Sequence, residues 1–435
     1  MKQSKDMIFK NSERKYETGK RVLAVGRYAD NDDIRSGYNN NDLIIGCSGS
    51  GKTGGYVIPN IRRLRGSMIV TDTKSQLSRM FTSELKAKGF KVYTIDFAEP
   101  ERSMGYNPLA YIRRLETAPA SQGEPETAFS NKDIVSLAHI LCPIRTVKDP
   151  FWEESAKMVL TFLIAFVLEA MVPEDHNMIS VVDVYRQLTH PDGRKAIELW
   201  CEENPDTFAA KKFAMFRQVL DVERTWGCIC QFLSEALEPF DFSEIQCIYK
   251  CTQPSNILDL EQIGMEPTVV FLNVSDTDRY ADSLVNLFYT QLLQITCRQA
   301  DRMPDGRLKV PVRFILDDFA ANTQIANFDK LISVIRSRNI SVSIILQNLT
   351  QLESMYSGSQ ASTILNNCDH ILYLGGQDIK TAQYIGFRCN KPEEYILLMP
   401  FDKAYLIERG KFGELVDKIP PYAEKSLFSS CEQEL

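Results

Sequence analysis

The sequence predicts an α/β protein in which a parallel-rich central sheet is interrupted by an inserted all-α domain. Short apolar runs of strand length, each followed by helix-compatible residues, occur before residue 108 and again after residue 264. Runs of this kind indicate strands buried on both faces, as in a parallel sheet covered by helices. Between the two groups, apolar residues recur with helical spacing instead.

The expected strands fall into two groups along the chain. The first group lies at 42–46, 67–72 and 91–97, and the second at 268–274, 312–317, 341–347, 370–374 and 404–407, with a helix at 281–300. We expect residues 1–108 (an N-terminal segment and the first part of the domain) and 264–417 to form one domain. Residues 418–435 form a flexible C-terminal tail.

Residues 109–263 predict the all-α insertion. Helical periodicity recurs over 134–141, 153–171, 181–188 and 209–237, with prolines between these stretches. By its proline, glycine and polar content, the stretch 116–127 is a loop. The apolar run 158–171 is shorter than the roughly 20 residues that span a bilayer. It therefore predicts a buried helix, and we expect no transmembrane segment in the chain.

Composition limits the possible functions of the 435 residues. The formal net charge of -7 argues against a protein that wraps duplex DNA over a wide basic surface. Any nucleic-acid contact is therefore expected to be local, through a few residues per subunit. The 11 cysteines show no zinc-binding spacing, which favours free thiols in a reducing cytosol.

A phosphate-binding loop is the strongest signal in the sequence. Residues 46–53 read GCSGSGKT and directly follow the first apolar run, as the pattern G-x-x-x-x-G-K-[ST] requires. Glycines let backbone N–H groups point at phosphates, a lysine reaches the β and γ phosphates, and a threonine hydroxyl binds Mg²⁺. The predicted cofactors are ATP and Mg²⁺, and the predicted ATP-binding residues are Gly46, Ser48, Gly49, Ser50, Gly51, Lys52 and Thr53.

The run at 312–318 supplies the acidic partner of this loop. Asp317 is expected to hold Mg²⁺ and Asp318 to polarise the attacking water, although two acids can also end a buried strand simply for solubility. Gln347 ends the next strand, where a polar side chain can sense the γ-phosphate, and where polar residues are also common.

Two arginines between these strands are candidates for catalysis in trans. Either Arg336 or Arg338 could reach the ATP of a neighbouring subunit and stabilise the charge of phosphoryl transfer. A solvated helix end that favours positive charge is the alternative. The sequence does not choose between the two arginines.

These motifs, in this order, resemble the type IV coupling proteins, the TraG-like conjugative DNA-transfer ATPases. The resemblance covers roughly 42–410 and rests on the phosphate loop and on GSMIVTDTKSQL (66–77), YNPLAYI (106–112), DPFWEESAKMVL (149–160), FILDDFAANTQI (314–325), RSRNISVSIILQNLTQLESMY (336–356) and NNCDHILYLGGQDIKTAQYIG (366–386). The chain departs from the family in three ways. Its DTKSQL replaces the frequent DPKGE, which leaves a role of Lys74 open. Asp318 stands where a glutamate is usual, and no N-terminal membrane anchor is visible.

The resemblance implies a RecA-like motor domain, a helical domain that receives substrates, and a ring of typically six subunits. It implies an ATP-driven coupling protein that delivers relaxase-bound DNA to a type IV secretion (conjugation) channel, at the cytoplasmic face of the bacterial membrane. The implied partners are DNA in the ring pore, relaxase and accessory relaxosome proteins, the channel's ATPases and inner-membrane components, and further copies of the chain. Two alternatives are an ATP-binding substrate receptor and a protein-secretion motor that moves no DNA.

Overall fold

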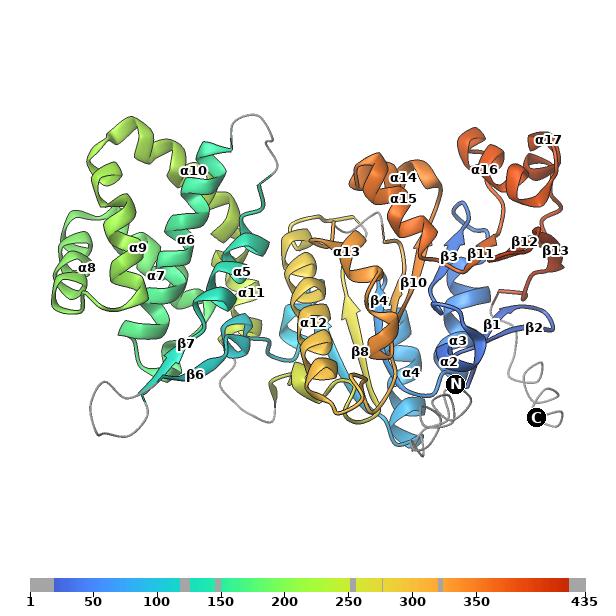
Figure 1. The fold of residues 1–435 in the computed structure, drawn as a ribbon, viewed down its shortest axis with the longest axis horizontal. Helices are drawn as coiled ribbons and strands as arrows, with labels where there is room; N and C mark the ends of the chain where they lie inside the picture. The colour runs from blue at the N-terminus through green and yellow to red at the C-terminus, as the bar shows by residue number, and fades with distance from the viewer. Residues whose placement is uncertain are drawn as a thin grey trace, which may run out of the picture.

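Two lobes lie side by side in the computed structural model, which describes residues 19–117, 126–144, 150–250, 256–275, 277–319 and 324–421. One lobe is built on a large sheet and the other is mainly helical (Figure 1). The sheet lobe takes its strands from both halves of the sequence, whereas the helices of the other lobe follow β5 and precede β8.

A nine-stranded sheet with the order β13-β12-β11-β3-β10-β9-β4-β8-β5 forms the larger lobe. Its strands are β3 (Asp42–Ile45), β4 (Ser67–Asp72), β5 (Lys91–Asp96), β8 (Thr268–Asn273), β9 (Val312–Leu316), β10 (Ile340–Leu346), β11 (His370–Tyr373), β12 (Lys403–Glu408) and β13 (Glu414–Asp417). All strands from β5 across to β11 are parallel, and β12 and β13 extend the sheet in antiparallel fashion. The predicted fold class is confirmed.

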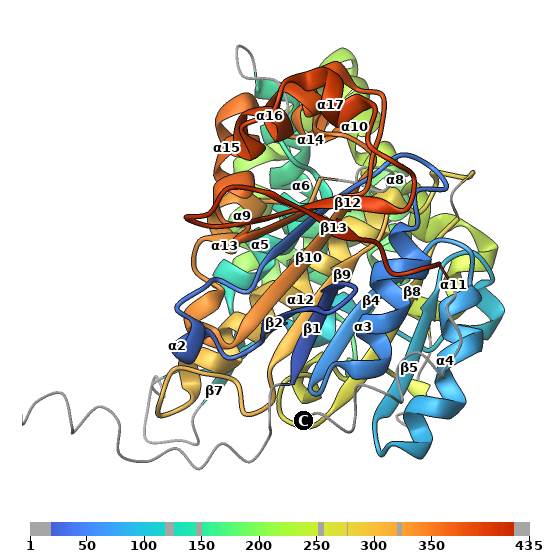
Figure 2. The same ribbon diagram turned by 90° about the vertical axis from the view of Figure 1, so that its right-hand side faces the viewer.

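Helices cover both faces of this sheet, as Figure 2 shows from the edge that carries β12 and β13. On one face pack α3 (Ile58–Arg63) and α4 (Gln76–Ala87), and on the other α12 (Asp282–Arg302) and α13 (Phe328–Ile332). Strands β3, β4, β8 and β9 are buried along their whole length. Burial on both faces explains why these strands read as continuous apolar runs.

Several edge elements were not predicted. The hairpin of β1 (Lys20–Ala24) and β2 (Arg27–Asp30), the helix α2 (Asp33–Ser36) and strand β13 are short and rich in polar residues. A small antiparallel sheet of β6 (Arg114–Thr117) and β7 (Glu126–Phe129) lies within the stretch taken as helices and loop. The prediction of an all-α insertion is therefore wrong in this detail, because these polar strands carry no apolar run. The limits at 109 and 263 stay a prediction.

The helical lobe is organised around one buried helix. Its helices are α5 (Asn131–Leu141), α6 (Phe151–Ala170), α7 (Met178–Thr189), α8 (Pro191–Glu203), α9 (Phe208–Phe216), α10 (Glu223–Asp241) and α11 (Ser243–Tyr249). Helix α6 contacts α5, α7, α9 and α10. A 3₁₀ turn (Arg217–Asp221) breaks the stretch 209–237 into two helices. Because the chain changes direction there, both α9 and α10 can pack on α6, which one straight helix could not do. Across the described ranges, no helix combines the length and apolarity needed to cross a bilayer.

The remaining helices lie near the strand ends in the second half of the chain. They are α14 (Leu349–Met355), α15 (Gly358–Asn366), α16 (Ile379–Cys389) and α17 (Glu393–Leu397). Helix α14 follows β10, and α16 follows β11. Both helices therefore start at the edge of the sheet where its parallel strands end.

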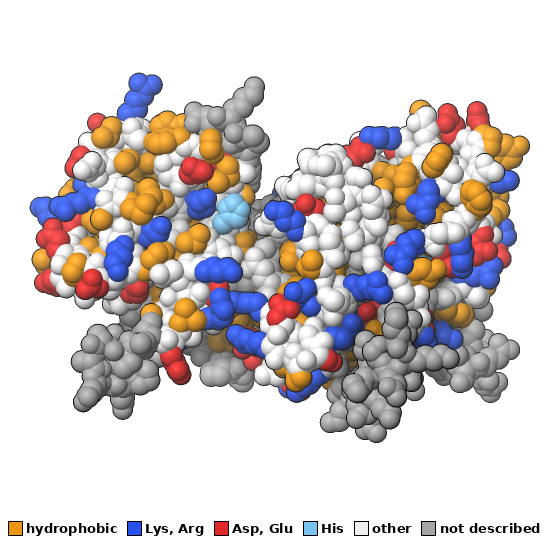
Figure 3. Space-filling view, in the orientation of Figure 1, with side chains coloured by type: hydrophobic (Ala, Val, Ile, Leu, Met, Phe, Trp, Pro, Cys, Tyr) orange, Lys and Arg blue, Asp and Glu red, His pale blue; other side chains and the backbone are white. Residues whose placement is uncertain are grey.

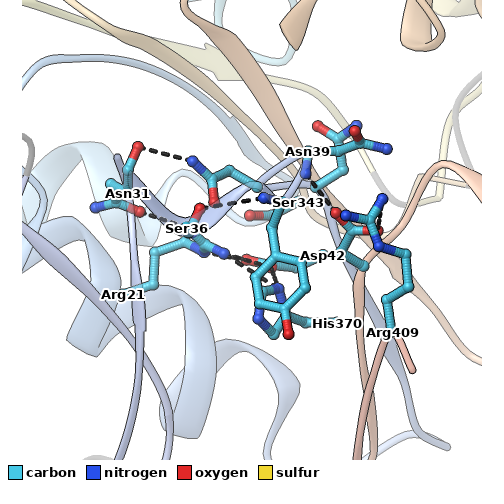
Figure 4. A network of polar contacts seen from close by, with 12 residues as sticks. Arg21, Asn31, Ser36, Asn39, Asp42, Ser343, His370 and Arg409 are labelled. Carbon is cyan, nitrogen blue, oxygen red and sulfur yellow. Dashed lines mark hydrogen bonds and ion pairs between the residues drawn. The ribbon is translucent and has the colours of Figure 1, made fainter. Parts of the chain in front are cut away.

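A buried network of charged side chains joins the strands at the opposite edge, where they begin (Figure 4). The carboxylate of Asp42 accepts hydrogen bonds from Arg21 Nε at 2.7 Å, Tyr56 Oη at 2.6 Å and Arg313 at 3.4 Å, and it lies 3.3 Å from His370 Nδ1. Burial alone would raise the pKa of Asp42, but Arg21, the hydrogen bond with His370 and the charge of Arg313 hold it well below its usual range. Asp42 is therefore a buried anion shared by several elements.

We expect Asp42→Asn to lower the free energy of unfolding by about 3–5 kcal/mol, because it leaves buried guanidinium groups without their counter-charge. Urea unfolding followed by circular dichroism measures the change. The exposed Asp206→Asn is the matched control and should stay within about 0.5 kcal/mol of the wild-type chain. Equal stability of the Asp42 variant and the control would contradict the role given to this carboxylate.

Candidate functional site

The loop 46–51 connects β3 to a helical turn, η1 (Lys52–Val57), and is held from both sides. The backbone N–H of Gly46 donates to Leu346 O, and that of Cys47 donates to Gly375 O, each at 3.0 Å. A Cβ at Gly46 would lie only 2.2 Å from Ser50 Oγ, and Gly51 has a φ of +97°. These two positions therefore need glycine, as the sequence pattern requires.

Lys52 folds back over the loop. Its Nζ donates to Gly46 O at 2.8 Å and to Cys47 O at 3.2 Å, and the residue is 8% exposed. Neutral carbonyls are weaker partners for an ammonium group than anionic oxygens. The ammonium group of Lys52 thus already lies inside the loop, where it can exchange these carbonyl partners for the oxygens of a bound anion.

Two acids end β9 beside the loop. Asp317 Oδ2 accepts a hydrogen bond of 2.7 Å from Thr53 Oγ1, and its Oδ1 accepts one of 3.1 Å from the backbone N–H of Asp318. Burial, together with the neighbouring charge of Asp318, raises the pKa of Asp317 to about 6, against the effects of Thr53 and Lys52. A hydroxyl and a carboxylate are oxygen ligands of the kind that Mg²⁺ prefers. A divalent cation between Thr53 and Asp317 therefore fits the residues present.

Asp318 has an unusual backbone. Its φ is +49°, in the left-handed region that non-glycine residues rarely adopt. Such strain concentrates at functional sites, where the surrounding structure fixes it. The conformation places Asp318 on the wall of the same pocket as Lys52.

One pocket brings most of the predicted residues together. Its lining includes Ser48, Gly49, Gly51, Lys52 and Thr53 from the loop, and Asp317, Asp318 and Gln347 from the ends of β9 and β10. Gly46 and Ser50 belong to the loop but do not line the pocket. Across the described ranges, no group of three or more His, Cys, Asp or Glu side chains could hold a metal by itself.

Sequence reasoning assigned no site role to several residues that line this pocket. Lys74 and Pro421 both line it. Lys74 follows Asp72, whose carboxylate accepts hydrogen bonds from the backbone N–H groups of Gln76 and Ser78 at the start of α4. The motif DTKSQL could have identified Lys74 as a site residue from the sequence. Nothing in the sequence indicated Pro421.

Residues 418–421 were predicted to begin a flexible tail, but they lie against the loop. Lys418 Nζ donates to Leu374 O at 2.6 Å, and a Cβ at Gly55 would lie 2.8 Å from Ile419 O. The rest of that predicted tail, 422–435, lies outside the described residues.

The two arginines lie away from this pocket. They form a 3₁₀ turn, η8 (Arg336–Arg338), directly before β10, whereas the loop follows the end of the parallel strand β3. Arg336 donates to Asp33 O at 3.1 Å, and Arg338 Nε donates to Asp301 at 2.9 Å. Neither arginine therefore reaches the pocket of its own chain.

Comparisons with known proteins agree with this architecture. The profile of a family described as "Type IV secretory system Conjugative DNA transfer" matches residues 2–391. Protein VirD4 of Agrobacterium fabrum (strain C58 / ATCC 33970) is 21% identical over 358 residues, covering 81% of this chain and 50% of that protein. Conjugal transfer protein TraG of the same organism is 22% identical over 364 residues, covering 80% and 50%. The chain thus spans about half the length of the curated relatives it matches.

Solved structures share the fold at low identity. Plasmid coupling protein TrwB in complex with the ATP analogue ADPNP has a TM-score of 0.66 and 13% identity, covering 96% of this chain and 92% of that one. TrwB in complex with ADP and Mg²⁺ has a TM-score of 0.63 and 14% identity, covering 96% and 98%. The predicted RecA-like fold is confirmed.

We expect Asp317→Asn to stabilise the protein in metal-free buffer at pH 7, by about 1–3 kcal/mol, because the variant removes a buried charge. A carboxyl whose pKa is raised to about 6 on folding favours the folded state below its unfolded pKa and loses that effect as pH rises through 6. The difference between the two proteins should therefore shrink as pH falls from 7 towards 4. Chemical unfolding with a chelator present measures it, and a difference independent of pH would contradict the burial argument.

Proposed function

Since the chain belongs to the type IV secretory system conjugative DNA-transfer family, we propose that it is an ATP-driven coupling protein that delivers relaxase-bound DNA to a type IV secretion channel. One observation carries the proposal. A single pocket gathers the phosphate loop, the buried acid Asp317, its neighbour Asp318 and the polar strand end Gln347. That set contains each group that phosphoryl transfer needs from one subunit.

The geometry supports a division of roles. Backbone N–H groups of 48–51 would bind the phosphates of ATP, and Lys52 would exchange its carbonyl partners for phosphate oxygens. Thr53 and Asp317 would hold Mg²⁺, which supplies charge to the departing phosphate. Asp318 would orient the attacking water and Gln347 would contact the γ-phosphate. TrwB, of the same fold, has been solved with ADP and Mg²⁺.

Lys74 is a further cation at the same wall. It is exposed, and within the described part of the chain its ammonium group makes no hydrogen bond or ion pair. A positive charge there would stabilise the anionic phosphates or the leaving group. Its role in this proposal is to bind nucleotide within one subunit.

Assembly and partners belong to the same proposal. The chain would form a ring of six subunits at the cytoplasmic face of the membrane, with DNA in the pore. The helical lobe would receive the relaxase and accessory proteins, and the sheet lobe would meet the ATPases and inner-membrane components of the channel. Separate lobes support this division, since the nucleotide pocket uses residues of the sheet lobe only.

The test is the ATPase rate with and without single-stranded and duplex DNA, using Lys52→Ala and the exposed Lys195→Ala as its control. We expect DNA to stimulate the wild type and Lys195→Ala, and Lys52→Ala to lose turnover by about 10³-fold or more. Turnover that DNA does not change would instead support a protein-secretion motor. ATP binding without turnover would support a substrate receptor. This alternative has a specific basis, because Asp318 has a shorter side chain than the glutamate that is usual at this position.

We also propose that Arg336 or Arg338 completes the site of a neighbouring subunit, and Arg336 is the better candidate. Its Nε lies 3.8 Å from Asp33, with 38% of its side chain exposed, whereas Arg338 pairs with Asp301 at 2.9 Å and is 24% exposed. Arg336→Ala should reduce turnover by about 10³-fold while ATP binding is nearly kept. Mixing it with Lys52→Ala should restore part of the activity, because mixed rings contain complete sites. Inactive mixtures of assembled proteins would argue against catalysis in trans.

A further inference from the structure

A groove lies between the end of α16 and the turn that joins β12 to β13. Its walls carry two exposed rings, Phe387 at 84% and Phe412 at 75% exposure, and three cations, Arg388, Lys391 and Lys411. In Figure 3 apolar, basic and acidic side chains all appear at this end of the molecule, around α16 and α17. Nothing in the proposed ATP chemistry uses these residues. We call this the Phe387–Phe412 groove.

The groove is preformed. The backbone N–H of Gly413 donates to Arg388 O at 3.1 Å, and a Cβ on that glycine would lie 2.3 Å from Cys389 Sγ. The turn is thus packed directly on the helix end. On the other wall the N–H of Lys391 donates to Gly386 O at 2.9 Å. The two rings are therefore presented by fixed backbone, and binding would not have to order these walls.

The charge of the groove is positive in a chain with a net charge of -7. No carboxylate is among the described residues that line it. Arg388 donates to the hydroxyl of Tyr384 at 3.0 Å, which orients its guanidinium group, and Lys411 pairs with Glu408 outside the groove. Within the described ranges, the ammonium group of Lys391 has neither a hydrogen bond nor an ion pair. The groove therefore suits an anionic ligand that also has flat apolar faces.

We propose that the Phe387–Phe412 groove binds single-stranded nucleic acid, with bases stacked on the two rings and phosphates facing the cations. Single strands combine a π-face and a negative charge in every nucleotide, and stacking on an aromatic side chain contributes about 1–3 kcal/mol per base. A duplex keeps its bases stacked on each other and cannot offer them to a ring. A protein segment would match the rings but needs its own acids to match the three cations.

The other end of α16 touches the nucleotide pocket. Leu349, two residues after Gln347, donates its N–H to Thr381 Oγ1 at 3.0 Å, and the phosphate-loop residue Cys47 donates to Gly375 O just before the helix. Helix α16 spans about 16 Å at 1.5 Å per residue. One rigid element therefore connects both nucleotide-contacting loops with the groove, so the position of a bound strand can follow the state of the pocket. This last step alone rests on the proposed function.

The test is direct binding of a labelled oligothymidine at low salt, measured by fluorescence anisotropy on the full chain without nucleotide. The double variant Phe387→Ala/Phe412→Ala should weaken binding by about 10²-fold or more, as the loss of two stacked bases implies. The variant Phe387→Trp/Phe412→Trp should keep the affinity, because it keeps both π-faces. Tyr395→Ala, which removes a 66% exposed aromatic on α17 outside the groove, should bind like the wild type.

Salt dependence tests the cations separately. Lys391→Gln should reduce the slope of log affinity against log salt by about 0.7, the value for one phosphate of a single strand. Duplex affinity should not change in any of these variants. The same measurements in Lys52→Ala protein separate this site from ATP turnover: turnover should be lost while oligothymidine affinity is retained, and turnover that persisted would contradict only the proposed function.

Two results would overturn the proposal. One is unchanged oligothymidine affinity in a folded Phe387→Ala/Phe412→Ala protein. The other is a change in oligomeric state of that variant, seen by analytical ultracentrifugation, without a change in affinity, which would assign the groove to a contact between copies of the chain.

Discussion

The buried carboxylate of Asp42 is the interaction on which the rest of the structure depends. It stands at the first residue of β3, and its partners come from β1 and η1, which are near in the sequence, and from β9 and β11, which are distant. Apolar contacts alone would let parallel strands slide by small steps, whereas a buried charge network is satisfied in one register only. By fixing where the strands begin, Asp42 also fixes which residues meet where they end.

The two edges of the sheet are chemically opposite. Around Asp42, two guanidinium groups and a tyrosine hydroxyl enclose one buried carboxylate. At the other edge Lys52 donates to two loop carbonyls, Asp317 is buried beside a second acid, and Asp318 has a backbone in the left-handed region. These groups have hydrogen bonds but are poorly neutralised, which destabilises the folded domain, and a nucleotide with its cation would neutralise them. Stability is therefore concentrated at one edge, and the capacity to bind ligand at the other.

The central strands and the phosphate loop could be predicted from sequence because each is a local pattern. Continuous burial gives β4 or β9 an apolar run, and the loop has a fixed spacing of glycines and lysine. Elements whose partners are distant gave no such pattern. The hairpin of β1 and β2 is short and has no apolar run of strand length. The 3₁₀ turn that separates α9 from α10 exists because both helices pack on α6. Pro421 reaches the pocket because the chain after β13 folds back towards the phosphate loop. Placing Arg336 likewise required knowing which end of β10 lies at the nucleotide pocket, and the sequence leaves that open.

The strand order also has a consequence for biosynthesis. Among the described strands, β3 pairs with β10 and β11 alone, so residues 42–45 find no partner there until residues 340–373 have left the ribosome. The helical lobe, whose contacts are mainly local, is complete long before that moment and can fold first. Meanwhile β3 stays unpaired, and β4 and β5 have no partner until β8 has been made, a state that favours aggregation. Production of this chain should therefore depend on chaperones that shield early strands, and slow translation would lengthen the exposure.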